Sequence, residues 1–282
     1  MHWGDSPRPG KNLGSQLNKR HFFSMRYAIS FAPPAHSLLW QQGSRWLGRD
    51  ALSGQSLPRP RFRDVDPERI AELTHAPAHY GFHATIVPPF RLMKNISEAD
   101  LLDNLAEFAS RQSPLPLSSF AIALFSSFFC LRPVRHSSAL QALASFCIRE
   151  FDHCRAPLTP SELARRKAAP LSGQEKNNLE IWGHPYVFEQ FRFYFTLTAR
   201  MTEGREQEAI HAALMATFSA LLADPLVIDA LCLFVEPAFG QPLRCLYRFP
   251  FPFQSAEPEE CIAHDQQLLP KNFYPGYQCH SA

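Results

Sequence analysis

Residues 80–91 read Y-G-F-H-A-T-I-V-P-P-F-R, and the interpretation of the rest of the chain depends on this stretch. Side chains alternate between the two faces of a β-strand, so Phe82 and Ala84 are predicted to face an apolar layer. His83 and Thr85 then project together from the opposite face. The stretch therefore predicts a strand that presents a titratable imidazole beside a hydroxyl group.

Residues 191–200 read F-R-F-Y-F-T-L-T-A-R and repeat this alternation over a longer run. Every second residue is apolar as far as Leu197, whereas Arg192, Tyr194 and Thr196 share the other face. The His-x-Thr of the first strand is matched here by Tyr-x-Thr. We interpret the two strands as equivalent parts of two half-domains whose polar faces line one cleft.

The elements predicted around these two strands follow the same order in each half of the chain. A strand, a helix and two further strands are predicted from residue 80 onward and again from residue 191. The repetition predicts an α+β fold, in which two pseudo-symmetric lobes with antiparallel-rich sheets face a central cleft. The predicted helices cover residues 37–47, 66–73, 98–111, 137–154 and 206–223, with connector helices at about 157–182. The other predicted strands cover residues 25–32, 115–124, 128–133, 227–235 and 244–249.

Domain boundaries are expected where this pattern of elements begins and ends. Residues 1–24 carry basic side chains but lack the apolar centre of a secretory signal, so we interpret them as a disordered N-terminal extension. Residues 25–253 are predicted to form the bilobal domain. Residues 254–282 are predicted to be a poorly ordered tail.

The composition excludes several classes of protein. Charged residues make up 19% of the 282 residues and the formal net charge is +2, so no broad basic field indicates nucleic-acid binding. The seven cysteines include no C-x-x-C pair, which argues against a disulfide framework and a structural zinc site and favours a reducing, cytoplasmic compartment. No apolar run reaches the 18 or so residues that span a bilayer, so we expect no membrane partner. No cofactor and no metal are expected.

His83 is the strongest candidate for chemistry. Its ordinary pKa of about 6.5 suits proton transfer at neutral pH, although a buried structural histidine is the alternative. Thr85 and Thr196 can donate hydrogen bonds to a phosphoryl oxygen, but threonine is also common in strands because it is β-branched. These three side chains, with Tyr194, form the predicted site.

Other side chains near the two strands are weaker candidates for substrate contact. Arg192 and Arg200 lie eight residues apart, or roughly 26 Å along a strand, so they cannot both hold one phosphate. His184 precedes a proline, where an extended backbone is favoured, and we expect a structural role for it. The full set of possible substrate contacts comprises Tyr80, Arg91, His184, Tyr186, Arg192 and Arg200.

Several motifs of this sequence resemble those of a known superfamily. H-A-T-I at residues 83–86 and Y-F-T-L at residues 194–197 are similar to the paired His-x-Thr/Ser motifs of the two-histidine phosphoesterases. R-Y-A-I-S-F-A-P-P, S-R-W-L-G-R-D, F-D-H-C-R-A-P-L and W-G-H-P-Y-V resemble its bacterial branch of phosphonate-metabolism proteins, a domain of unknown function often encoded beside carbon–phosphorus lyase genes. The resemblance covers about residues 25–250. It implies a bilobal hydrolase that cleaves cyclic phosphodiesters without a metal.

The resemblance also implies roles for the site residues. One motif histidine, here His83, would take a proton from water or a ribose hydroxyl, while Thr85 and Thr196 would hold the phosphoryl group. The second motif histidine is replaced by Tyr194, and His184 stands where the family has a tyrosine. A phenol with a pKa near 10 is a poor base at neutral pH, so weakened catalysis is expected.

Three functions remain open at the level of sequence. The first is a phosphoesterase-like protein acting on a cyclic phosphate or a ribosyl phosphodiester, with a small phosphate ester as its partner. The second is a non-catalytic module that binds a phosphate ligand or an RNA end. The third is an interaction protein with a vestigial cleft.

Overall fold

The computed structural model describes residues 25–117, 119–222 and 225–252. The extension predicted at 1–24 and the tail predicted at 254–282 lie outside these residues. The helices are α2 (Leu38–Leu47), α3 (Pro67–Tyr80), α4 (Glu98–Ser110), α5 (Ser138–Glu150), α6 (Pro160–Lys167), α7 (Gly173–Trp182) and α8 (Arg205–Phe218). The strands are β1 (Arg26–Phe31), β2 (Ala84–Phe90), β3 (Leu115–Leu117), β4 (Phe120–Phe125), β5 (Phe128–Pro133), β6 (Phe195–Thr196), β7 (Leu226–Ile228), β8 (Ala230–Glu236) and β9 (Arg244–Pro250).

Seven of these strands form one antiparallel sheet in the order β4-β5-β6-β2-β1-β8-β9. The two motif strands, β2 and β6, are therefore direct neighbours. The β4–β5 hairpin of the first half pairs with β6 of the second half, and the β8–β9 hairpin pairs with β1 beside β2. β3 and β7 form a separate two-stranded sheet. The α+β class and the antiparallel pairing are thus confirmed, and the two halves of the sequence are interleaved in space.

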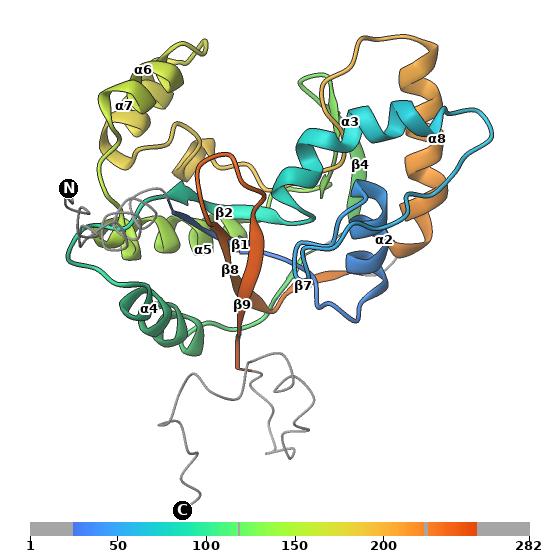
Figure 1. Ribbon diagram of the computed structural model, residues 1–282. Coiled ribbons are helices and arrows are strands. Elements are labelled where there is room, and N and C mark those ends of the chain that lie inside the picture. Colours follow the sequence, from blue (N-terminus) through green and yellow to red (C-terminus); the bar gives the residue numbers. More distant parts are fainter. Residues whose placement is uncertain (1–24, 118, 223–224, 253–282) are drawn as a thin grey trace, which may run out of the picture. The chain divides into compact units, whose positions relative to one another are not determined.

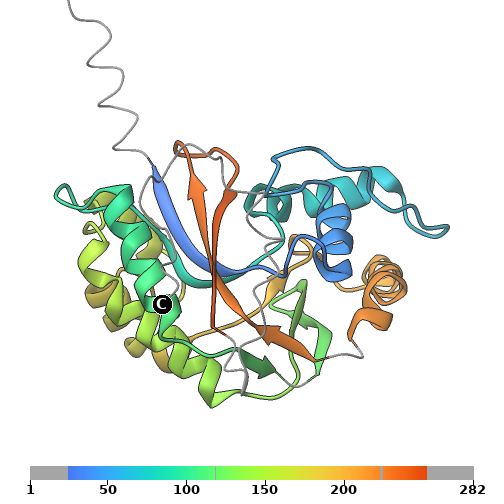
Figure 2. The same ribbon diagram turned by 90° about the horizontal axis from the view of Figure 1, so that it is seen from below.

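The helices gather in two groups beside the sheet, with α2, α3 and α8 in one group and α4 to α7 in the other (Figures 1 and 2). In the first group, the Trp46 ring of α2 contacts Phe218 of α8 at 6.3 Å between centroids. Phe218 also stacks with Phe82, which in turn stacks on Phe195 of β6 at 4.8 Å. This aromatic core backs the apolar face of both motif strands. Burying such rings contributes about 1.5–3 kcal/mol for each side chain.

The predicted helix starts are confirmed by their capping geometry. Ser37, Asp66 and Ser137 each accept a hydrogen bond from a backbone N–H of the first turn. Ser97 and Thr159 complete capping boxes with acidic residues three positions later. These local interactions account for the success of prediction at these sites.

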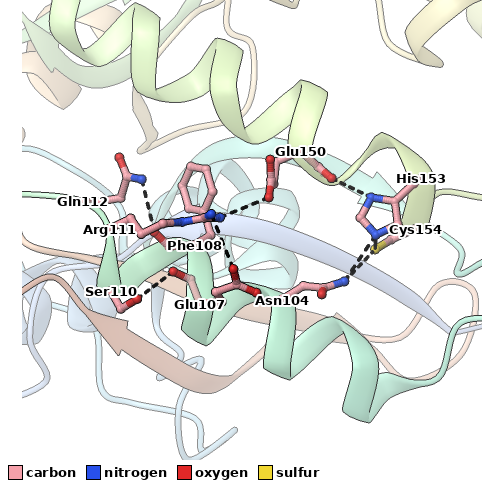
Figure 3. Close-up of polar contacts among 9 residues, drawn as sticks. All are labelled: Asn104, Glu107, Phe108, Ser110, Arg111, Gln112, Glu150, His153 and Cys154. Atoms are coloured by element: carbon pink, nitrogen blue, oxygen red, sulfur yellow. Dashed lines mark hydrogen bonds and ion pairs between the residues drawn. The ribbon is translucent and has the colours of Figure 1, made fainter.

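Polar contacts join α4 and its C-terminal end to the end of α5 (Figure 3). The Arg111 guanidinium pairs with Glu150 at 3.3 Å, and Asn104 lies 3.3 Å from the His153 ring. Cys154 lies below His153 and is buried. These contacts hold α4 against the end of α5, and the Cys154 carbonyl accepts a hydrogen bond from the Met93 amide just beyond β2.

Two predicted elements have different bounds in the structure, namely the helix before β2 and the second motif strand. The helix predicted to end at residue 73 continues to Tyr80, because Thr74, Pro77 and Ala78 extend its buried face and Gly81 adopts φ 85° to turn the chain toward β2. β6 is also shorter than predicted. Beyond it, the Leu197 and Thr198 amides both bond to the Phe129 carbonyl, so the regular ladder ends.

Two further observations concern the described residues as a whole. None of their helices has the length and apolarity needed to cross a membrane. Five of the seven cysteines lie in this part of the chain, and all five are free buried thiols.

Candidate functional site

The predicted site residues lie at the starts of two adjacent strands: Thr85 and Thr196 belong to β2 and β6, whereas His83 and Tyr194, which were predicted inside the strands, come directly before them. Ala84 of β2 pairs with Phe195 of β6, and both point to the buried layer. Continuing this register by one residue in each direction places Thr85 opposite Tyr194 and His83 opposite Thr196. Because side chains alternate, this register assigns all four to the opposite face of the sheet, where diagonal neighbours such as His83 and Tyr194 are expected to have Cβ atoms about 7–8 Å apart.

His83 lies in a more buried place than its sequence pattern suggests. Its Nε2 lies 3.2 Å from Thr85 Oγ1, and its ring packs against Phe234 at 4.4 Å between centroids. The side chain is only 8% exposed, and Nδ1 has no hydrogen-bond partner of good geometry among the described residues. Burial lowers the pKa of His83 to about 4, against the opposing effect of the Gly81 and Tyr80 carbonyls. The imidazole is therefore neutral at pH 7.

Tyr194 is half-buried among aromatic rings. Phe125 and Phe128, which pair with each other across the β4–β5 hairpin, lie within 5.8 Å and 5.6 Å of its ring centroid. Burial raises the pKa of Tyr194, as does the Cys130 thiol, while Arg192 acts in the opposite direction. The phenol therefore keeps its proton at neutral pH and can donate a hydrogen bond.

The three threonines near the motif strands differ in environment. Thr85 and Thr196 are half-buried on the polar face. Thr198, two residues further on, is buried, and its Oγ1 accepts a hydrogen bond from the Phe129 amide at 2.9 Å. Thr198 is therefore a structural residue, although its alternation pattern matches that of Thr196.

His184 lies in a cavity of about 30 Å³ at the end of β2. Its Nδ1 accepts from the Tyr186 amide at 3.2 Å. Burial lowers the pKa of His184 to about 3, and the positive charges of Arg166 and Arg192 act in the same direction. The Arg91 guanidinium lines this cavity and donates to Glu162 at 3.2 Å and to the Pro157 carbonyl at 2.7 Å, so it joins β2 to α6. The side chains of His184 and Arg91 are thus both engaged in contacts with other residues of the protein.

The four remaining candidates for substrate contact do not gather at one place. Tyr80 is exposed at the end of α3 rather than on the strand. Tyr186 stacks under Arg192, whose guanidinium carbon lies 4.1 Å from the ring centroid, and Arg192 also pairs with Glu175 at 3.3 Å. Arg200 is exposed beyond β6. The structure therefore keeps Arg192 beside Tyr194 and leaves Tyr80 and Arg200 away from the regular part of the two strands.

Sequence reasoning missed Arg132. β5 pairs with β6 through Leu131 and Phe195, and one residue further this register places Arg132 opposite Tyr194. Arg132 and Tyr194 both line a cavity of about 190 Å³. The F-F-C-L-R-P strand shows alternation in the sequence, but nothing local indicates that β5 pairs with the second motif strand rather than with the first.

The described residues include no group of three His, Cys, Asp or Glu side chains that could hold a metal ion. The polar face offers instead hydroxyl groups, a neutral imidazole and a neutral phenol, beside cationic arginines. This donor set suits an anion with several acceptor oxygens.

Comparison with known proteins gives both relatives and structural neighbours. The chain is 34% identical over 229 residues to "Ribose 1,5-bisphosphate phosphokinase PhnN" of Janthinobacterium sp. (strain Marseille), covering 80% of this chain and 51% of the relative. It is 37% identical over 221 residues to the protein of the same name in Laribacter hongkongensis (strain HLHK9), covering 78% of this chain and 50% of the relative. The chain thus spans about half the length of the curated relatives it matches.

Among solved structures, E. coli LigT complexed with 3′-AMP aligns over 81% of this chain and 98% of LigT, with 13% identity and a TM-score of 0.38. A crystal structure described as a phosphoesterase aligns over the same shares of the two chains, with 14% identity and a TM-score of 0.34. Scores this low carry no argument about this chain. The family model for DUF1045, a protein of unknown function, matches residues 85–244, which are more than half of the chain. The chain therefore belongs to the DUF1045 family.

Proposed function

We propose that this protein is a phosphoesterase-like member of the two-histidine superfamily, with weakened catalysis, that acts on a cyclic phosphate or a ribosyl phosphodiester. The observation that carries the proposal is the contact of His83 Nε2 with Thr85 Oγ1 at 3.2 Å, at the start of the strand that pairs directly with the strand of Thr196. In this proposal His83 is the base, Tyr194 the proton donor and the Thr85 and Thr196 hydroxyls the phosphate ligands.

The proposed chemistry follows from the protonation states. When the substrate binds, the Thr85 hydroxyl turns from His83 Nε2 to donate to a phosphoryl oxygen, and the Thr196 hydroxyl donates to another. Neutral His83 then takes a proton at Nε2 from a water molecule as that water attacks phosphorus. Tyr194 donates its proton or a hydrogen bond to the leaving ribose oxygen. Catalysis is weak because the raised pKa of Tyr194 makes the phenol a poor proton donor near pH 7.

The named relatives support a role near ribose phosphates and phosphonate metabolism. Their name describes a kinase that acts on ribose 1,5-bisphosphate. The present sequence contains no G-x-x-x-x-G-K-[ST] phosphate-binding motif, so the kinase activity is not carried over to it. From these relatives we carry over only the class of ligand, a phosphate ester of ribose, to this protein.

A non-catalytic phosphate-binding module is the second candidate. It is favoured by the 8% exposure of His83, which restricts the access of a water molecule to the imidazole. The same hydroxyl groups would then hold a ligand without turnover.

The test is hydrolysis of 2′,3′-cyclic nucleotides, followed by phosphorus NMR. We expect slow turnover by the wild type and a loss of about 100-fold or more in His83→Gln, because general acid–base assistance contributes about 10²- to 10⁴-fold. His75→Gln is the matched control, since His75 is an exposed histidine of α3. Absence of turnover with a clear ligand-induced thermal shift would instead favour the binding module.

A further inference from the structure

The cavity that Tyr194 lines forms a cationic pocket whose arginines the proposed chemistry does not use. It holds about 190 Å³ and is lined by strands β4 and β5, the start of α5 and the segment that leads into β6. Its charged or titratable lining residues are Arg132, Arg135, Arg192, His136, Glu189 and Tyr194. Positive charge therefore predominates in the pocket.

Two of the arginines have no carboxylate partner among the described residues. Arg192 pairs with Glu175 at 3.3 Å, whereas neither Arg132 nor Arg135 lies within ion-pair distance of any acidic side chain that the structure describes. Such guanidinium groups keep their donors available for an anionic ligand.

Aromatic stacking holds two of these guanidinium groups in place. The guanidinium carbons of Arg132 and Arg192 lie 5.8 Å and 5.4 Å from the centroid of the same Phe125 ring. Arg192 also stacks on Tyr186 at 4.1 Å. Stacked arginines lose less side-chain freedom when they bind an anion, so the pocket is pre-organised.

The start of α5 adds to the positive potential. Ser137, the N-cap of this 13-residue helix, lines the pocket. The N-terminus of a helix carries partial positive charge and favours anions nearby.

The pocket adjoins the proposed reaction site: Tyr194 lines it, whereas His83, Thr85 and Thr196 do not. Adjacent strands lie about 4.8 Å apart, so Arg132 on β5 is roughly 10 Å from the strand of His83 and Thr85, with Tyr194 between them. One pentose can bridge such a distance. We propose that the pocket binds a second phosphate group of the substrate, and that the substrate is a cyclic phosphate ester of a sugar that carries another phosphoryl group. This inference rests on the proposed function, because it places the first phosphoryl group at the two motif strands.

The test compares two ligands that differ by one phosphate: adenosine 2′,3′-cyclic phosphate with a free 5′-hydroxyl and the same nucleotide with a 5′-phosphate. Binding is measured by calorimetry and turnover by phosphorus NMR, in the wild type, Arg132→Gln and Arg135→Gln. Arg63→Gln is the matched control, because Arg63 is exposed in the segment between α2 and α3 and outside the pocket.

We expect the wild type to bind the 5′-phosphorylated ligand about tenfold or more tightly, as a charge-assisted hydrogen bond would give, and each pocket variant to lose most of this preference. Arg63→Gln should keep it. Equal affinity for the two ligands in the wild type, or an unchanged preference in both pocket variants, would overturn the inference. If the preference is seen and neither ligand is hydrolysed, the second-phosphate pocket stands and the hydrolytic function fails.

Discussion

His83 combines two properties that work against each other. Its contact with Thr85 gives the imidazole a partner on the polar face, while its packing against Phe234 removes it from water. Burial keeps the ring neutral at pH 7, which leaves a lone pair free to accept a proton. The same burial makes the positive form costly, so His83 is a weak base and its protonated state does not persist.

Tyr194 provides the clearest prediction at the scale of a single residue. Replacing the phenol with an imidazole in Tyr194→His should raise single-turnover hydrolysis of a 2′,3′-cyclic nucleotide by part of the range of about 10²- to 10⁴-fold that acid–base assistance covers. Tyr194→Phe should be slower than the wild type, because it removes the proton. If Tyr194→His is slower than the wild type, the phenol is itself an effective catalytic group and our description of weakened catalysis is wrong.

Thr196 and Thr198 allow a second prediction at this scale. Thr198→Val should destabilise the protein by about 1–3 kcal/mol, because the buried Phe129 amide loses its acceptor. Thr196→Val should change stability by less than about 0.5 kcal/mol and weaken ligand binding instead. Urea unfolding measures the first effect and calorimetry the second. Equal destabilisation by both substitutions would contradict the distinction between a structural and a functional threonine.

At the scale of elements, the position of β6 explains why the site could be predicted only in part. The alternation in residues 191–197 indicates which side chains share a face, and the structure confirms that Phe193, Phe195 and Leu197 are buried. The pairing of β5 with β6 depends on chain segments more than 60 residues apart. Alternation within one strand carries no information about its neighbours, and for this reason Arg132 was missed.

Helix α2 supports the segment that leads into β2. Gly43 lies so close to Phe82 that an added Cβ atom would be 2.4 Å from the ring. Gly43→Ala should therefore destabilise the protein by about 1–3 kcal/mol, as overpacking does, in spite of the better helix propensity of alanine. Gly173→Ala at the start of α7 is the control, since its Cβ would meet nothing within 4 Å. Denaturant unfolding checks both, and a neutral Gly43→Ala would show that Phe82 can move freely.

At the scale of the whole described domain, the two buried histidines predict how stability depends on pH. The pKa values of His83 and His184 are lowered to about 4 and about 3, so the unfolded chain takes up protons first as the pH falls below about 6.5. The free energy of unfolding is therefore not reduced by these histidines above pH 6.5. It falls as the pH drops from 6.5 toward 4, by on the order of 1 kcal/mol per pH unit for each histidine.

Unfolding free energies measured from pH 7.5 to pH 4.5 test this dependence. His83→Gln and His184→Gln should each show a shallower loss of stability on acidification than the wild type, even if they are less stable at pH 7.5. His75→Gln should keep the wild-type slope, because His75 is exposed. Identical slopes in all four proteins would show that the two imidazoles are solvated.

The central claim is that His83 and Tyr194 act on one phosphoryl group. A double-mutant cycle tests it most directly, with kcat/KM or, in the absence of turnover, the binding free energy of adenosine 2′,3′-cyclic phosphate measured for the wild type, His83→Gln, Tyr194→Phe and the double variant. If both side chains contact the same group, the double variant should lose clearly less than the sum of the two single losses, with a coupling of about 0.5–3 kcal/mol. Losses that add fully, or a single variant that binds like the wild type, would contradict the claim.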